Sequence, residues 1–249
     1  MYEEIKDQIV DICHRMWTKG WVAANDGNVS VKVAEDRYLA TQTGISKHEI
    51  TRDHIGLIDG NFNVIEKPTE NWKASSEIKM HMKCYQERPD VGAVVHAHPP
   101  VATGFACAHK PLDDYCMIET VIAVGSVPLT PYGTPSTYEV PQAIEPYLPY
   151  HDVMLLTNHG ALTVGADLTT AYYRMETLKN KDHVLLIYPS MESSQRHILD
   201  AGNDGDEVYP VYADGVRSMV SANPQLHYML FGTLHPILIH RDELYSLMK

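Results

Sequence analysis

The sequence has little positive charge, and this limits its partners. Its 249 residues include 20 Lys or Arg against 32 Asp or Glu, a net charge of −12. A nucleic-acid surface needs clustered basic side chains, and no such cluster is present, so we expect no nucleic-acid partner. A phosphorylated metabolite is not excluded, because backbone N–H groups and a metal ion can hold a phosphate locally.

Cysteines and long apolar runs are also scarce. The four cysteines lie far apart and show no Cys-x-x-Cys spacing, so we expect neither a disulfide framework nor a zinc ribbon. No apolar run approaches the length that spans a bilayer, and the acidic start of the chain does not resemble a signal peptide. We therefore expect a cytoplasmic protein without a membrane partner.

What the chain does contain is an alternation of strand and helix patterns. Hydrophobic residues make up 44% of it, which suffices for a sizeable core. Periodicity predicts helices at 3–19, 78–88, 101–109, 137–148 and from Asp167 or Thr169 to about Ile187. It predicts strands at 29–33, 38–41, 91–95, 152–157 and 161–165, with two more around the Asp59-Gly60 turn. Because several strands are joined by tight turns, the fold is α/β or α+β and not an all-parallel sheet.

Histidines stand at the ends of two predicted buried strands. His96 and His98 are one residue apart, so on a strand they share one face, and Pro99-Pro100 ends that strand. His159 stands in a tight turn after the strand 152–157. An isolated His-x-His pair also suits ordinary hydrogen bonding. Three imidazoles at strand ends suit catalytic zinc, which commonly takes three protein ligands and keeps one position for substrate.

The carboxylate beside these histidines is assigned to Glu77, although spacing alone leaves Glu119 and the Asp113-Asp114 pair open. Ser75 or Ser76 is expected to cap the helix that follows, with Glu77 in its first turn. Two hydroxyls and free N–H groups at a helix N-terminus also form an anion site. Glu77 is therefore a candidate metal ligand, general base, or each in turn.

Five short segments together carry a family resemblance, and they follow one another through nearly the first two hundred residues. They are Gly27-Asn28-Val29-Ser30, Thr41-Gln42-Thr43-Gly44-Ile45, Ser75-Ser76-Glu77, His96-Ala97-His98 and Asn158-His159-Gly160. In this order and spacing, the chain resembles the class II aldolase/epimerase family.

The resemblance implies a single class II aldolase-like domain over residues 1–249, with 200–249 as a poorly matched C-terminal extension. Its fold would be a mixed three-layer α/β/α sandwich with a central, mostly antiparallel sheet, and its assembly a homotetramer. The resemblance also implies one Zn²⁺ per chain, or another divalent metal, on His96, His98, His159 and Glu77, with Glu77 as acid/base. It further implies a substrate phosphate pocket made by Gly27, Asn28, Thr43, Gly44, Ser75 and Ser76.

The activity implied is that of a zinc-dependent aldolase. It would cleave a ketose 1-phosphate such as L-fuculose 1-phosphate, reversibly, to dihydroxyacetone phosphate and an aldehyde such as lactaldehyde. A same-family dehydratase, decarboxylase or epimerase acting on a phosphorylated sugar is the alternative. A non-catalytic adducin-like binding module is disfavoured by the intact histidine set. The tyrosine expected to protonate the leaving group is left open among Tyr115, Tyr209, Tyr212 and Tyr228.

Overall fold

The computed structural model describes residues 2–113 and 118–187, with backbone only for Glu119 and 179–187. The elements in chain order are α1 (Glu3–Thr18), β1 (Asn28–Ala34), β2 (Arg37–Thr41), η1 (Arg52–His54), β3 (Ile55–Ile58), β4 (Val64–Glu66), α2 (Ile78–Glu87), β5 (Ala93–Ala97), α3 (Pro100–Cys107), α4 (Ile118–Ala123), β6 (Leu129–Thr130), α5 (Glu139–Ile144), β7 (Val153–Leu156), β8 (Gly160–Gly165) and α6 (Leu168–Ile187).

The chain divides into two compact units. The first comprises 1–112 and 127–179, and the second comprises 113–126 and 180–249. The sheet and the site described below belong to the first unit, whereas α4 belongs to the second. The prediction of one domain over 1–249 remains a prediction, and its C-terminal part, 200–249, lies outside the described residues.

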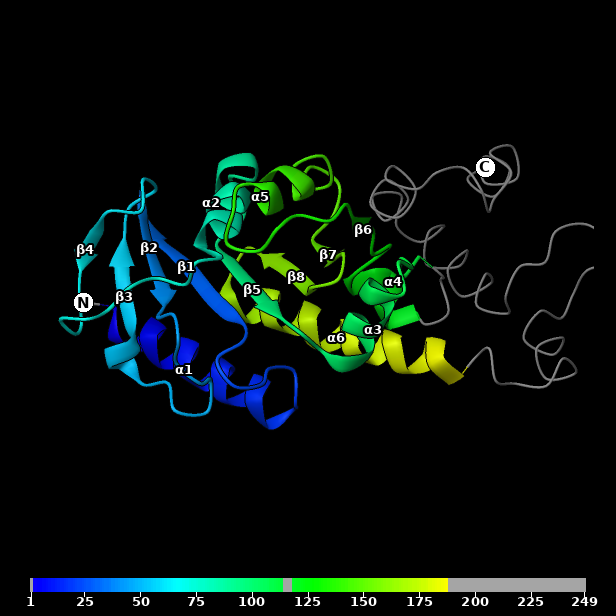
Figure 1. The fold of residues 1–249 in the computed structure, drawn as a ribbon, viewed down its shortest axis with the longest axis horizontal. Coiled ribbons are helices and arrows are strands. Elements are labelled where there is room, and N and C mark those ends of the chain that lie inside the picture. The colour runs from blue at the N-terminus through cyan, green and yellow to red at the C-terminus, as the bar shows by residue number, and fades with distance from the viewer. Residues whose placement is uncertain (1, 114–117, 188–249) are drawn as a thin grey trace, which may run out of the picture. The chain divides into compact units, whose positions relative to one another are not determined.

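The first unit is built on one mixed sheet with strand order β4-β3-β2-β1-β5-β8-β7-β6. Only the short pair β6 and β7 is parallel, and the other neighbouring strands of this sheet are antiparallel. Helices α2 and α5 cover one face, and α1 and the start of α6 cover the other (Figure 1). The mixed three-layer α/β fold with a mostly antiparallel sheet is therefore confirmed.

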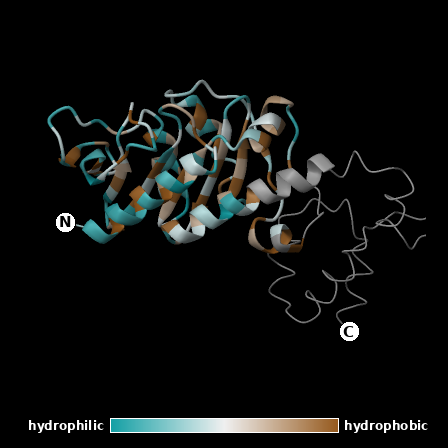
Figure 2. Cartoon of the chain, turned by 90° about the horizontal axis from the view of Figure 1, so that it is seen from below, coloured by the Kyte–Doolittle hydropathy of each residue, from teal (hydrophilic) through white to brown (hydrophobic). Residues whose placement is uncertain are grey.

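Side-chain burial explains why the central strands are continuous apolar runs. All five residues of β5 are buried, because helices cover both faces of the sheet there. A core cluster packs α2 and α5 against this sheet, with Met80, Met82 and Ile144 facing Val94 and Leu162. Figure 2 shows hydrophobic strands behind helices whose outward sides are mainly hydrophilic. None of the helices in the described part of the chain is both long enough and apolar enough to cross a bilayer.

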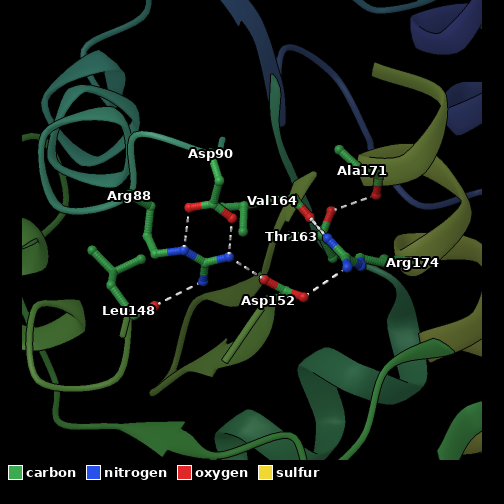
Figure 3. Close-up of polar contacts among 8 residues, drawn as sticks. All are labelled: Arg88, Asp90, Leu148, Asp152, Thr163, Val164, Ala171 and Arg174. Carbon is green, nitrogen blue, oxygen red and sulfur yellow. Dashed lines mark hydrogen bonds and ion pairs between the residues drawn. The ribbon is translucent and has the colours of Figure 1, made fainter. Parts of the chain in front are cut away.

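An ion-pair network closes one end of the sheet (Figure 3). Asp152, just before β7, accepts a hydrogen bond from Arg88 Nη2 at 3.0 Å and forms an ion pair with Arg174 Nη2 at 2.6 Å. Arg88 also binds Asp90 and the Leu148 carbonyl. The strand register places Val153 opposite Thr163, and the β7–β8 turn at the other end. The network therefore stabilises the end of strands β7 and β8 that is opposite the turn with His159.

Several expected boundaries were wrong. Neither Ser75 nor Ser76 caps α2, because the helix begins at Ile78 and Glu77 occupies the cap position without a side-chain capping bond. The Ser75 hydroxyl instead accepts a hydrogen bond from Glu77 N at 3.3 Å, inside a turn that precedes the helix. The helix expected at 137–148 is only Glu139–Ile144, and the strand expected at 91–95 runs from Ala93 to Ala97.

Candidate metal centre

The three predicted histidines meet at one point. His96 is on β5, His98 follows that strand, and His159 lies in the turn between the adjacent β8 and its neighbour β7. One ligand nitrogen from each lies within 4.8 Å of the others. The ring centroids are 4.6–5.1 Å apart. Strand pairing therefore assembles the set that the sequence pattern indicated.

A hydrogen bond fixes the His96 ring, and a carboxylate lies beside the His98 ring. His96 Nδ1 lies 2.9 Å from the Ala161 carbonyl and donates to it, which leaves the Nε2 lone pair free. That Nε2 lies 3.1 Å from His98 Nε2. His98 Nδ1 lies 3.6 Å from Asp26 Oδ2 on its other side. The Nε2 atoms of His96 and His98 point at each other. The opposite nitrogen of His96 is hydrogen-bonded to a carbonyl, and that of His98 faces a carboxylate, so the pair forms a donor set that fits a divalent cation.

The space for the His98 ring comes from a glycine. A Cβ on Gly160 would lie 2.5 Å from His98 Cδ2 and 2.7 Å from the Ala97 carbonyl oxygen, both closer than real Cβ contacts. Asn158, in the same turn, adopts a positive φ of 57°. The turn Asn158-His159-Gly160 thus carries the candidate ligand His159, and its glycine leaves space for the ring of His98.

Burial disfavours the protonated form of all three imidazoles. Burial lowers the pKa of His96 well below its usual value, and the neighbouring His159 and His98 lower it further. Burial also lowers the pKa of His98 and, with His98 as a second cause, that of His159. A metal ion binds the neutral imidazole, so these shifts favour metal binding near neutral pH.

Glu77 is buried near the three histidines, but its carboxylate is not part of the cluster of ligand atoms that they form. Its exposed fraction is 9%, and its charge raises the pKa of His98 and His159, as does that of Asp26. The carboxylate itself accepts hydrogen bonds from Ser136 N at 2.6 Å and Ser136 Oγ at 3.2 Å. The group of ligand atoms found among the described residues comprises the three histidines alone. The alternatives Glu119 and Asp114 have no described side chain, and Asp113 is exposed.

The predicted phosphate-binding residues come from three loops at the same end of the sheet. Thr43 N donates to Lys73 O at 3.0 Å and Ser75 N donates to Thr41 O at 3.1 Å, so the loop at 42–44 lies against 73–75. Asn28 lies opposite His96 in the β1–β5 register. It is buried, and its side-chain oxygen has no hydrogen-bond partner among the described residues. Gly27 is held nearby with a φ of 72°, where a Cβ would be 2.5 Å from Val22 Cγ1.

Sequence reasoning missed three residues of this region. Asp26 faces His98, and Ser136 holds Glu77 from a loop 59 positions away. Lys47 is 1% exposed, and its Nζ donates to Ile45 O at 3.0 Å and lies 3.5 Å from Asn25 O, so it links the two glycine loops. Burial lowers the pKa of Lys47. No spacing rule indicates these contacts, although Asp26 does stand inside a segment singled out as a turn.

The proposed proton-donating tyrosines cannot be placed beside this centre. Tyr115, Tyr209, Tyr212 and Tyr228 all lie outside the described residues.

Comparison with known proteins gives a consistent result. Residues 7–184 match the family described as Class II Aldolase and Adducin N-terminal domain. An L-fuculose phosphate aldolase of Escherichia coli O6:H1 (strain CFT073) is 35% identical over 166 residues, which cover 67% of this chain and 75% of the relative. An L-fuculose phosphate aldolase of Methanocaldococcus jannaschii is 32% identical over 186 residues, covering 73% of this chain and 96% of the relative.

Solved structures agree on the fold. An L-fuculose 1-phosphate aldolase superposes with a TM-score of 0.70 at 22% identity, covering 100% of this chain and 96% of the other. The l-fuculose-1-phosphate aldolase of Thermus thermophilus gives a TM-score of 0.64 at 25% identity, covering 80% of this chain and 97% of the other.

Proposed function

The chain belongs to the class II aldolase and adducin N-terminal domain family and is a metal-dependent class II aldolase, and we propose that zinc is its metal and a ketose 1-phosphate its substrate. A substrate like L-fuculose 1-phosphate would give dihydroxyacetone phosphate and an aldehyde such as lactaldehyde. The observation that carries this proposal is the meeting of three histidines beside a buried carboxylate and the glycine loops. The family resemblance supports a homotetramer, and the composition supports a cytoplasmic protein.

The metal would be held by His96, His98 and His159, with Glu77 as a further ligand in the resting site. When bound, it would supply Lewis-acid polarisation of the substrate carbonyl. The remaining steps belong to residues of the chain and to the substrate.

The substrate phosphate would be held by neutral groups. Backbone N–H groups of the loops at Gly27 and Gly44 and the hydroxyls of Thr43, Ser75 and Ser76 are suited to bind its oxygens. The Asn28 amide, whose oxygen has no partner among the described residues, can also reorient to donate through its nitrogen. This anchoring would fix the distance from C1 to the acid/base.

Cleavage would break the C3–C4 bond. The C4 hydroxyl loses its proton as C4 becomes the aldehyde carbon, and the electron pair of the broken bond remains on C3. Glu77 would deliver a proton to C3, which completes dihydroxyacetone phosphate, and would remove it in the reverse direction. The proton of the C4 hydroxyl passes to a different group, which donates it back to the aldehyde oxygen in the reverse direction. The four tyrosines named above are the candidates for this group.

A panel of ketose 1-phosphates tests the substrate class. Dihydroxyacetone phosphate is detected by coupled reduction with NADH, and the products are identified by mass. We expect equal amounts of dihydroxyacetone phosphate and aldehyde, and no reaction with unphosphorylated ketoses. Products lighter by one water, or by carbon dioxide, would assign a dehydratase or decarboxylase, and an isomer without fragments an epimerase. A panel without dihydroxyacetone phosphate would contradict the proposal.

A further inference from the structure

Ser136, in the loop before α5, contacts the beginning of α2 through each of its polar groups. Its N–H and its hydroxyl both reach Glu77 Oε1, at 2.6 and 3.2 Å. The hydroxyl also lies 2.8 Å from Ser76 Oγ. Its carbonyl accepts a hydrogen bond from Lys79 Nζ at 2.8 Å. One loop residue thus spans the proposed acid/base and a proposed phosphate-binding serine.

The backbone of Ser136 is in a conformation that favours glycine. Its φ is 67°, in the left-handed region that L residues with a Cβ rarely adopt. Glycine would take this conformation without strain, so the serine costs stability here. What serine adds over glycine is the hydroxyl, and that hydroxyl contacts Glu77 and Ser76.

These contacts tie the Glu77 carboxylate to the loop that carries Ser136. Two donors converge on a single carboxylate oxygen, which holds the group toward the loop. The Glu77 carboxylate nonetheless remains close enough for its charge to act on His98 and His159. The arrangement keeps the carboxylate beside the metal centre and competes with its ligation there.

We propose that Ser136 is a positioning residue that stabilises the Glu77 carboxylate once it has left the metal, so that Glu77 is available to exchange a proton with substrate. This inference rests on the proposed function. It predicts that the Ser136 hydroxyl weakens metal binding and supports turnover, two effects that a merely structural loop contact would not produce together.

Two substitutions separate the hydroxyl from backbone strain. Ser136→Ala removes the hydroxyl and keeps the Cβ, whereas Ser136→Gly removes the hydroxyl and relieves the positive φ. The melting temperature should therefore be higher for Ser136→Gly than for Ser136→Ala. Both variants keep the backbone N–H donor, so their functional changes should be alike.

The decisive measurement is the Zn²⁺ dissociation constant, obtained by competition with a chromophoric chelator. Loss of a hydrogen bond to a charged group should tighten Zn²⁺ binding by roughly 10- to 100-fold in both variants, because Glu77 then ligates more readily. The tightening should vanish when Glu77→Gln is also present. In both single variants kcat should fall by about 10-fold while KM for the phosphorylated substrate changes less, as expected when proton transfer is impaired.

An unchanged Zn²⁺ constant in both variants, or a tightening that persists with Glu77→Gln, would overturn the inference while leaving the proposed function intact. A wild-type protein that neither takes up Zn²⁺ nor cleaves any ketose 1-phosphate would overturn both.

Discussion

At the scale of single residues, the candidate metal centre depends on the groups that orient its histidine rings. The Ala161 carbonyl fixes His96 through Nδ1, and Asp26 lies on the Nδ1 side of His98. Both rings therefore turn Nε2 to the same point, 3.1 Å apart. Partners of this kind, behind the ligating nitrogens, raise metal affinity by orienting the rings in advance.

Gly160→Ala tests this packing. The added Cβ would meet His98 Cδ2 at 2.5 Å and the Ala97 carbonyl at 2.7 Å, so the ring must move. We expect Zn²⁺ affinity to fall by roughly 10- to 100-fold, the usual cost of disturbing support around a ligand. Affinity is measured by chelator competition.

Gly104→Ala is the matched control, because a Cβ there meets nothing within 4 Å and the residue lies inside α3. It should leave Zn²⁺ affinity unchanged and stabilise the fold by about 0.5–1 kcal/mol. Equal affinities in Gly160→Ala and Gly104→Ala would show that Gly160 has no part in placing His98.

Glu77→Gln tests the acid/base at nearly constant shape. The amide keeps an oxygen that can accept from Ser136 N, so the local structure should persist. Because an amide cannot exchange a proton with C3, we expect kcat to fall by roughly 10² to 10⁴ while the three histidines still hold metal. Turnover and metal content are measured on the same preparation. Near-normal turnover would remove Glu77 from this role.

At the scale of elements, strand pairing brings the site together. β1 pairs with β2 and β5, and β5 with β8, so the glycine loops, His96, His98 and His159 reach one end of the sheet. The loop at 42–44 is then joined to 73–75 by backbone hydrogen bonds. Segments that are far apart in sequence thus border one site.

Replacing Ser75 and Ser76 together by alanine tests the phosphate pocket. Loss of two hydroxyl donors should raise KM for the phosphorylated substrate by roughly 10²-fold or more, since each lost hydrogen bond to a charged group costs about 1.5–3 kcal/mol. The effect on kcat should be smaller, because these groups bind the phosphate in ground and transition states alike. An unchanged KM would exclude both serines from the pocket.

Much of this arrangement was predictable from the sequence, for a physical reason. Apolar periodicity reports burial, so it predicted α1, α6 and most strands, and two-residue spacing placed His96 and His98 on one face. The predicted N-cap was wrong because the Ser75 hydroxyl accepts a hydrogen bond from the backbone N–H of Glu77, which lies before the helix. The Ser136–Glu77 contact was missed because it joins residues 59 positions apart through tertiary packing, which no local pattern encodes.

At the scale of the molecule's first unit, one end of the sheet carries a stabilising ion-pair network and the other carries the candidate site. The network around Asp152 ties α2, β7, β8 and α6 together at one end (Figure 3). The histidines and glycine loops occupy the other end. Between them, within the core, His81 Nδ1 lies 2.7 Å from Ser30 Oγ, which in turn lies 2.8 Å from Tyr85 OH.

This buried histidine predicts acid sensitivity. Burial lowers the pKa of His81 from 6.5 to about 3. Between about pH 6.5 and pH 3, His81 is therefore protonated in the unfolded chain and neutral in the folded one. Its contribution to the free energy of unfolding is fully present above pH 6.5 and is lost as the pH falls through this window. For this one group the free energy of unfolding should fall by about 1.4 kcal/mol per pH unit.

Urea unfolding of metal-free protein between pH 4.5 and 7 measures the effect. His96, His98 and His159 have lowered pKa values as well and add to the slope in the same direction. His81→Gln keeps a side chain able to bond Ser30 and removes the titrating ring, so its slope should be smaller by about one proton. Identical slopes would show that His81 does not carry this sensitivity.

The central claim is that one metal on three histidines makes this chain an aldolase, and a zinc titration tests it most directly. Protein stripped with a chelator is titrated with Zn²⁺ while dihydroxyacetone phosphate release from a ketose 1-phosphate substrate is followed. We expect no activity in the stripped protein and a linear rise to a plateau at about one equivalent per chain, as a single three-histidine site requires. Full activity in the stripped protein, or no activity at any zinc level across the substrate panel, would contradict the account.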